Sequence, residues 1–181
     1  MGQGNWKAWS LVALSLVLAV YAFGLLYEGF VAQRYSGVFS FPFIDKAAAE
    51  RAYQRLPANA PLADQEVAAR RLIEADPTNS QSWDAVSYVE FLKAGGMSAG
   101  AIEALDHSYA VSFFDRQAAV WRIGYALENW AALPPALRAD VLAEADVALE
   151  DPVLAPKVKA RLAQVRSPPG RLAALLVLAQ H

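Results

Sequence analysis

The chain has 181 residues, 18 acidic and 16 basic, and a net charge of −2, so it lacks the basic excess that nucleic-acid binding requires. It contains no cysteine, which excludes a thiolate nucleophile. Alanine is frequent and runs of β-branched residues are scarce, a composition that favours helix over sheet. We therefore expect an all-α protein without a nucleic-acid partner.

Residues 8–27 form an uncharged and almost wholly apolar run between Lys7 and Glu28. As a helix, this run would span about 30 Å, which is the thickness of the hydrocarbon core of a bilayer. Aromatic residues lie near both of its ends, where headgroups favour them. The sequence thus predicts a transmembrane helix, and the residues expected to anchor it are Trp9, Leu11, Leu14, Leu18, Phe23, Leu26 and Tyr27.

Two other interpretations of this run remain open. One is a cleaved signal peptide with its cleavage site at Val20-Tyr21-Ala22, and the other is a buried core helix. We favour a retained anchor because the apolar run continues past that site to Leu26. The short tail of residues 1–7 carries Lys7 and would stay in the cytoplasm, which predicts a single-pass protein of the bacterial inner membrane with its domain in the periplasm.

After the anchor, residues 28–44 form an aromatic connector and residues 45–181 form one helical domain. Caps and breakers divide this domain: Asn79 and Ser98 can begin helices, the pair Gly95-Gly96 can end one, and Pro135 can occupy a first turn. Asp45 is expected to cap the first helix. Helices are predicted over residues 45–56, 63–75, 80–93, 98–111 and 116–133, then from 135, and over 153–165.

Two predictions concern the environment of particular helices. The helix over 116–133 is apolar almost all round, so we expect it at the centre of the domain with Trp121 buried. The carboxylates of the following helix, among them Asp140 and Glu144 at i, i+4 spacing, have no histidine nearby. We interpret them as a solvated acidic face, and we expect no metal site.

The tail, residues 152–181, carries five basic residues and no acidic one, and it ends in an apolar run. Leu172, Leu175 and Leu176 in that run would favour aggregation if they were exposed. We expect this segment to dock on the domain, with the anionic membrane surface or a partner as the alternatives.

The stretch ARRLIEADPTNSQSWDAVSYVEFLKAGGMSAGAIEALDHSYAVSFFD resembles tetratricopeptide repeats. Pro77 closes one unit, Trp83 follows six residues later, Gly95-Gly96 forms the turn, and Trp121 recurs 38 residues after Trp83. The resemblance covers residues 69–142 and implies an α-solenoid of helical hairpins that binds a protein partner.

The segment HSYAVSFFDRQAAVWRIGYALENWAALPPALRADVLAE is also similar to small anchored helical-repeat proteins encoded beside cell-surface polysaccharide polymerases and ligases in Gram-negative bacteria. This similarity carries no catalytic residue with it. It implies an accessory role in polysaccharide assembly.

No catalytic or cofactor motif is apparent in the sequence, so we predict a protein that is not an enzyme and has no cofactor. The first hypothesis is a membrane-anchored adaptor for a membrane or periplasmic protein, and the second is an integral subunit of a larger complex held through its transmembrane helix. An enzyme is the third and least favoured. Aromatic and arginine side chains anchor most interfaces, and the candidate partner-binding residues are Trp83, Tyr88, Tyr109, Arg122, Tyr125, Asn129 and Trp130.

Overall fold

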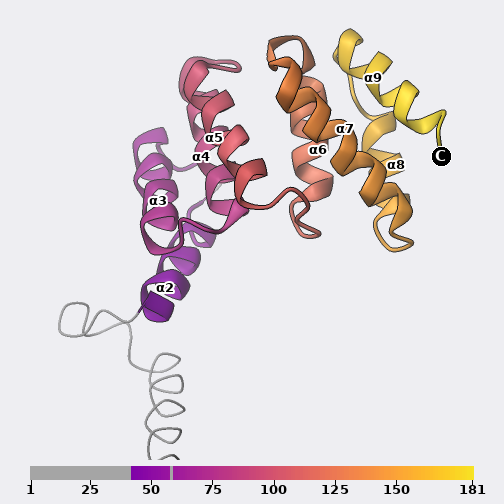
Figure 1. The fold of residues 1–181 in the computed structure, drawn as a ribbon. Coiled ribbons are helices and arrows are strands. Elements are labelled where there is room, and N and C mark those ends of the chain that lie inside the picture. The colour runs from indigo at the N-terminus through magenta and orange to yellow at the C-terminus, as the bar shows by residue number, and fades with distance from the viewer. Residues whose placement is uncertain (1–41, 58) are drawn as a thin grey trace, which may run out of the picture. The chain divides into compact units, whose positions relative to one another are not determined.

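A computed structural model describes residues 42–57 and 59–181 (Figure 1). Every regular element in these ranges is a helix and none is a strand, which confirms the predicted all-α class. The elements are α2 (Pro42–Gln54), α3 (Leu62–Ala75), α4 (Ser80–Ala94), α5 (Ala99–Val111), α6 (Ala119–Glu128), the 3₁₀ turn η1 (Trp130–Ala132), α7 (Pro135–Glu150), α8 (Ala155–Ala163) and α9 (Pro168–Leu178).

The tail 1–7, the predicted anchor at residues 8–27 and most of the connector 28–44 lie outside the described residues. Among the described helices, none is both long enough and apolar enough to cross a bilayer. The chain divides after Ala48, and residues 49–181 form one compact unit. The buried clusters and the candidate site belong to that unit.

The predicted helix boundaries are confirmed where cap residues set them. The side chain of Asn79 accepts a hydrogen bond from the Gln81 amide, and that of Ser98 from the Ala101 amide, so α4 and α5 begin where expected. Gly95 ends α4 in the left-handed conformation, at a φ of 68°.

Two boundaries differ from the prediction. Asp45 does not cap the first helix, because α2 already begins at Pro42 and Asp45 lies in its first turn. The helix predicted over 116–133 is shorter: α6 ends at Glu128 and the 3₁₀ turn η1 follows it. The side-chain amide of Asn129 donates to the Tyr125 carbonyl at 2.9 Å, which satisfies one of the free acceptors at the end of α6.

Two aspartates 36 residues apart begin α6 and α8 in the same way. The Asp115 carboxylate accepts hydrogen bonds from the amides of Gln117 and Ala118, at 2.8 and 3.4 Å. Asp151 accepts from the amides of Val153 and Leu154, at 2.8 and 3.1 Å. Each carboxylate therefore supplies the acceptor for one amide, that of Gln117 or Val153, and a second acceptor for the next amide, which also donates to the aspartate carbonyl.

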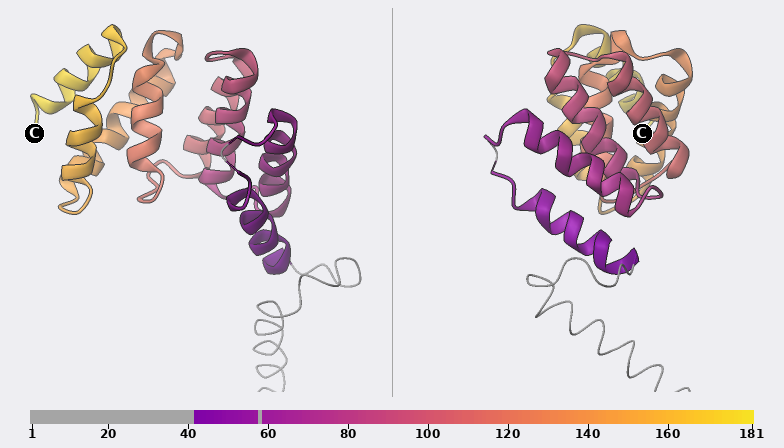
Figure 2. Two further views of the ribbon diagram at one scale, coloured as in Figure 1. Left: turned by 180° about the vertical axis from the view of Figure 1, so that it is seen from behind. Right: turned by 90° about the vertical axis from the view of Figure 1, so that its left-hand side faces the viewer.

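Three buried apolar clusters lie between the helices, which pack on neighbours in chain order, and α6 also packs on α8 and α9. Figures 1 and 2 show α4 beside α5, and α6 beside α7, in agreement with the contacts between these pairs. The first cluster joins the end of α2 to α3 and α4. The second lies between α5, α6 and α7, and the third joins α6, α7, α8 and α9.

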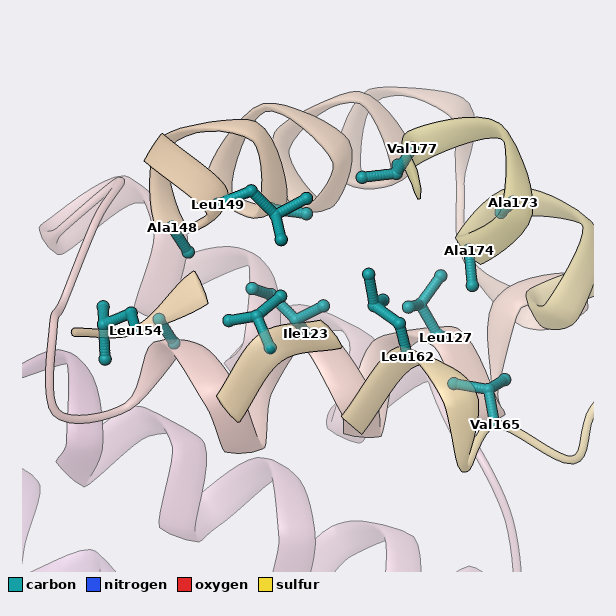
Figure 3. Packing of buried hydrophobic residues seen from close by; sticks show 13 residues of the cluster. Ile123, Leu127, Ala148, Leu149, Leu154, Leu162, Val165, Ala173, Ala174 and Val177 are labelled. Atoms are coloured by element: carbon teal, nitrogen blue, oxygen red, sulfur yellow. The ribbon is translucent and has the colours of Figure 1, made fainter. Parts of the chain in front are cut away.

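Helix α6 contributes to both of the larger clusters, through Tyr125 and Ala126 on one side and Ile123 and Leu127 on the other. In Figure 3, Ile123 and Leu127 lie in the third cluster with the side chains of the last three helices. The central position predicted for this helix is thus observed. The predicted burial of Trp121 is wrong, because 40% of this residue is exposed. An all-apolar sequence gives no indication of which side a helix leaves open.

The C-terminal apolar run forms α9, whose inner face docks on the domain as expected. Ser167 caps this helix by accepting a hydrogen bond from the Gly170 amide, and two prolines occupy the first turn, where a missing N–H costs nothing. Small residues form the buried face, namely Gly170, Ala173, Ala174 and Val177. Leu172, Leu175 and Leu176 remain largely exposed, contrary to the expectation that they would dock.

Candidate functional site

A layer of buried polar side chains crosses the interior between α4, α5, α6 and α7. It includes Asp84 from α4, Ser108 and Tyr109 from α5, Arg122 from α6 and Glu144 from α7. Burying charge in this way is costly unless each group is paired and hydrogen-bonded. In this layer, within the described part of the chain, the hydrogen bonds of Arg122 and Glu144 are complete, whereas those of Asp84 are not.

Arg122 and Glu144 form an ion pair in which neither side chain is exposed to solvent. The Arg122 Nε lies 3.1 and 3.0 Å from the two carboxylate oxygens of Glu144, and Nη2 also donates to Oε1. The Tyr109 hydroxyl donates to Glu144 Oε2 at 2.7 Å. The carboxylate is thereby held by two side chains from two different helices.

The rest of the Arg122 guanidinium reaches back to the end of α5. Nη1 donates to the Ser108 hydroxyl at 2.9 Å and to the Ser112 carbonyl at 3.1 Å, and Nη2 donates to the Phe113 carbonyl at 3.0 Å. Its carbon also lies 4.0 Å from the centre of the Tyr109 ring, a cation–π arrangement. All five N–H groups of the guanidinium thus have acceptors, so this ion pair meets the condition for a stable buried charge.

These surroundings shift the pKa values of the network. Burial raises the pKa of Glu144, and the hydrogen bonds from Arg122 and Tyr109 oppose that change. Burial and the adjacent Glu144 charge together hold the pKa of Tyr109 far above its usual range, so this hydroxyl stays protonated and serves as a donor. Burial acts to lower the pKa of Arg122, but the bond to Glu144 raises it overall.

Asp84 lies in the same layer and is bonded quite differently. The residue is only 5% exposed, and neither carboxylate oxygen has a hydrogen-bond partner among the described residues. Burial raises the pKa of Asp84 to about 7. The nearby Ser108 hydroxyl and the positive charge of Arg122 oppose this rise, and the negative charges of Glu144 and Asp115 add to it. The carboxyl group of Asp84 therefore changes its charge near neutral pH inside the domain.

An aromatic cluster lies on the surface where α4 meets α6. The rings of Trp121 and Tyr125 stack with centroids 4.8 Å apart, and the Tyr88 ring meets the edge of Trp121 at 6.1 Å. Phe91 packs against Tyr125 at 5.7 Å. We call the cluster of Tyr88, Phe91, Trp121 and Tyr125 the aromatic surface. Tyr88 and Trp121 are 39% and 40% exposed, so these two rings are its accessible part.

The seven candidate partner-binding residues differ in burial and fall into three groups. Tyr109, Arg122 and Tyr125 are buried, so they support the fold and leave no surface for a partner. Tyr88 is exposed, whereas Trp83, Asn129 and Trp130 are partly buried.

The partly buried candidates all have partners within the chain. Trp83 stacks on His107 at 4.6 Å and donates its indole N–H to the Pro77 carbonyl at 2.9 Å. The guanidinium of Arg138 lies 5.6 Å from the centre of the Trp130 ring. Asn129 is engaged at the end of α6, as described above.

Glu144 is a further correction, because the sequence placed it on a solvated acidic face. The side chains of Leu137, Val141, Glu144 and Ala148 follow one another at i, i+4, i+7 and i+11, which is a single helical stripe, and all four are buried. An acidic residue inside an apolar stripe, together with Arg122 inside an apolar helix, is a signal that could have identified the pair. In the part of the chain described by the structure, no group of His, Cys, Asp and Glu side chains could hold a metal ion.

Comparison of the chain with protein-family models, with curated proteins and with solved structures finds no match.

Proposed function

We propose that this chain is a non-enzymatic, membrane-anchored adaptor that binds a protein partner through a tetratricopeptide-like array of helical hairpins. The anchor would be the apolar run at residues 8–27. The resemblances noted in the sequence suggest a partner in the assembly of cell-surface polysaccharide. In this proposal the anchor restricts the search for the partner to the plane of the membrane, and the domain supplies the contact.

The aromatic surface is the single observation that carries the proposal. Its two accessible rings, Tyr88 and Trp121, come from two neighbouring helices, and their inner sides rest on Tyr125. Tyrosine and tryptophan supply much of the energy at interfaces because they bury a large area with few rotatable bonds. We propose that an apolar side chain of the partner packs against the exposed part of the Trp121 ring.

The regular succession of hairpins also supports an adaptor. The capping aspartates Asp115 and Asp151 repeat at 36 residues, close to the length of a tetratricopeptide unit. Arrays of this kind act by contact, since each hairpin packs only on its neighbours and their side chains together form an extended binding surface.

Site-specific photo-crosslinking of the full chain in its own membrane tests the proposal. A photoreactive phenylalanine analogue in place of Tyr88 should capture one discrete partner. The same analogue in place of Leu62, an apolar residue of α3 that is 40% exposed, should not. Combining the probe at position 88 with Trp121→Ala should abolish the product while circular dichroism stays helical. Equal capture from positions 62 and 88, or capture that ignores Trp121→Ala, would contradict the proposal.

A further inference from the structure

Helix α9 has two apolar faces, and only one of them is covered by residues that the structure describes. Its inner face is buried against α6, α7, α8 and η1. On the outer side, Leu172, Leu175 and Leu176 are 63%, 61% and 59% exposed. These three leucines occupy positions i, i+3 and i+4 and so form one continuous stripe. We call it the leucine stripe.

The last two helices carry an excess of positive charge, although Asp146 of α7 lies 3.2 Å from His181 at the end of the tail. The last two helices carry Lys157, Lys159, Arg161, Arg166 and Arg171, and no acidic residue occurs from 152 to 181. None of these five side chains forms an ion pair with a residue that the structure describes. Because α8 and α9 pack against each other, at an axis spacing of about 8–10 Å, bases on α8 lie within about one Debye length of α9.

An open recess beside the start of α9 contains two of these bases. It has a volume of about 540 Å³ and is lined by Arg161, Gln164, Arg166 and Glu128. The Glu128 carboxylate is engaged by the backbone amides of Arg166 and Ser167, each at 3.1 Å. The recess therefore holds two guanidinium groups beside the carboxylate of Glu128.

From this combination we infer that α9 binds the surface of an anionic membrane, with the leucine stripe inserted among the acyl chains and the bases of α8 and α9 on the lipid headgroups. An exposed apolar stripe on a segment with an excess of positive charge is the feature that interfacial helices share. A second copy of the chain fits this surface poorly, because a symmetric pair of α9 helices would bring five bases against five. The contact is separate from the aromatic surface and does not depend on a protein partner.

The absence of cysteine makes a local test possible in the full chain. Leu175→Cys, labelled with an environment-sensitive fluorophore, would report directly on the leucine stripe. The matched control is Val111→Cys, an exposed apolar position at the end of α5. The probe must be local, because the anchor predicted at residues 8–27 would hold the chain on a vesicle of any composition.

The labelled chain is mixed with vesicles of equal parts phosphatidylglycerol and phosphatidylcholine, or of phosphatidylcholine alone. We expect a blue shift at position 175 with the anionic vesicles only, reversed by salt, and no shift at position 111. Replacing Lys157 and Lys159 by glutamine should weaken the contact about fivefold per base. The same change at Arg70 and Arg71 on α3 should not.

Four results would overturn the inference. Identical shifts with both kinds of vesicle would remove the role of charge, and equal shifts at positions 175 and 111 would indicate unspecific insertion. A blue-shifted signal without vesicles that grows with protein concentration would identify a second copy as the occupant. The same signal without concentration dependence would identify another segment of this chain.

Discussion

Replacing the buried carboxylate of Asp84 by an amide should stabilise the domain, and the gain should depend on pH. The pKa of Asp84 rises from its ordinary 3.8 to about 7 in the folded protein. The folded state therefore binds this proton more tightly than the unfolded state. Stability from this group is fully present below about pH 4 and is lost as the pH rises towards 7.

The size of the effect follows from the two pKa values. At 1.36 kcal/mol per pH unit, the step from 3.8 to about 7 corresponds to roughly 4 kcal/mol, as an upper estimate. Asp84→Asn preserves the shape of the side chain but cannot ionise. We expect it to raise the free energy of unfolding by roughly 2–4 kcal/mol at pH 8, and to change it by less than about 1 kcal/mol at pH 4.

Urea unfolding of the full chain in mild detergent, followed by far-ultraviolet circular dichroism at several pH values, measures this difference. Three other carboxylates change stability with pH in the opposite direction, because folding lowers their pKa values and their contribution is lost as the pH falls. They are Glu66, Asp115 and Asp151. Subtracting the wild-type curve from that of Asp84→Asn removes their contribution. Asp106→Asn, which alters an exposed carboxylate of α5, is the control and should shift stability by less than about 0.5 kcal/mol. If Asp84→Asn has the same effect at pH 4 and at pH 8, burial of the charge is not the cause.

Three further predictions concern packing and the ion pair, and unfolding in urea measures each. Glu144→Gln should lower the free energy of unfolding by roughly 3–5 kcal/mol because it leaves the Arg122 charge buried and unpaired. The double change Arg122→Met with Glu144→Leu removes both charges and should recover much of that loss. A larger loss in the double variant would contradict this reasoning. Tyr109→Phe should lower the free energy of unfolding by about 1–3 kcal/mol because Glu144 loses a hydrogen-bond donor. Tyr125→Phe should cost less, because the Ser87 hydroxyl that contacts Tyr125 keeps its bond to the Ala101 carbonyl. The reverse order would refute the argument. Gly170→Ala should destabilise the docking of α9 by roughly 1–3 kcal/mol because the new methyl group meets the Leu127 backbone carbonyl, whereas Gly124→Ala meets only the movable end of Arg161 and should cost less; equal costs would show that both sites relax.

The sequence predicted most helix boundaries because single residues determine them. Asn79, Ser98 and Gly95 act through their own side chains or backbone within one turn, so a local pattern is sufficient. No helix is predicted from the run Ser167-Pro168-Pro169-Gly170, although a serine followed by two prolines is a suitable helix start, and α9 begins there.

The interior of the candidate site was less accessible to prediction because it depends on contacts between distant segments. Glu144 is acceptable on a buried stripe only because Arg122, 22 residues earlier, lies opposite it. Trp121 was expected inside because its helix is apolar, but α6 has neighbours on only part of its circumference. Asp84 gives no local sign of burial, because its neighbours in the sequence do not distinguish it from a solvent-exposed carboxylate. In the structure α4 lies between α3 and α5 and is buried on several sides.

The position of Arg122 has a mechanical consequence. Its guanidinium is bonded to the carbonyls that end α5 and to the carboxylate of α7, so it crosses the joint between two hairpins. Separating these hairpins would break the buried ion pair in a single step and leave both charges without a partner. The joint therefore resists small displacements and opens only all at once. The contact of α3 with α4 combines four buried apolar residues, Ala69, Leu72, Ala85 and Val89, with the ion pairs Arg70–Glu90 and Lys93–Glu66 near the surface. Ion pairs near the surface add little, so if the chain is pulled from its N-terminal side, as the proposed membrane anchor would pull it, the array yields first at its N-terminal helices, while the stretch from α5 to α7 moves as a unit.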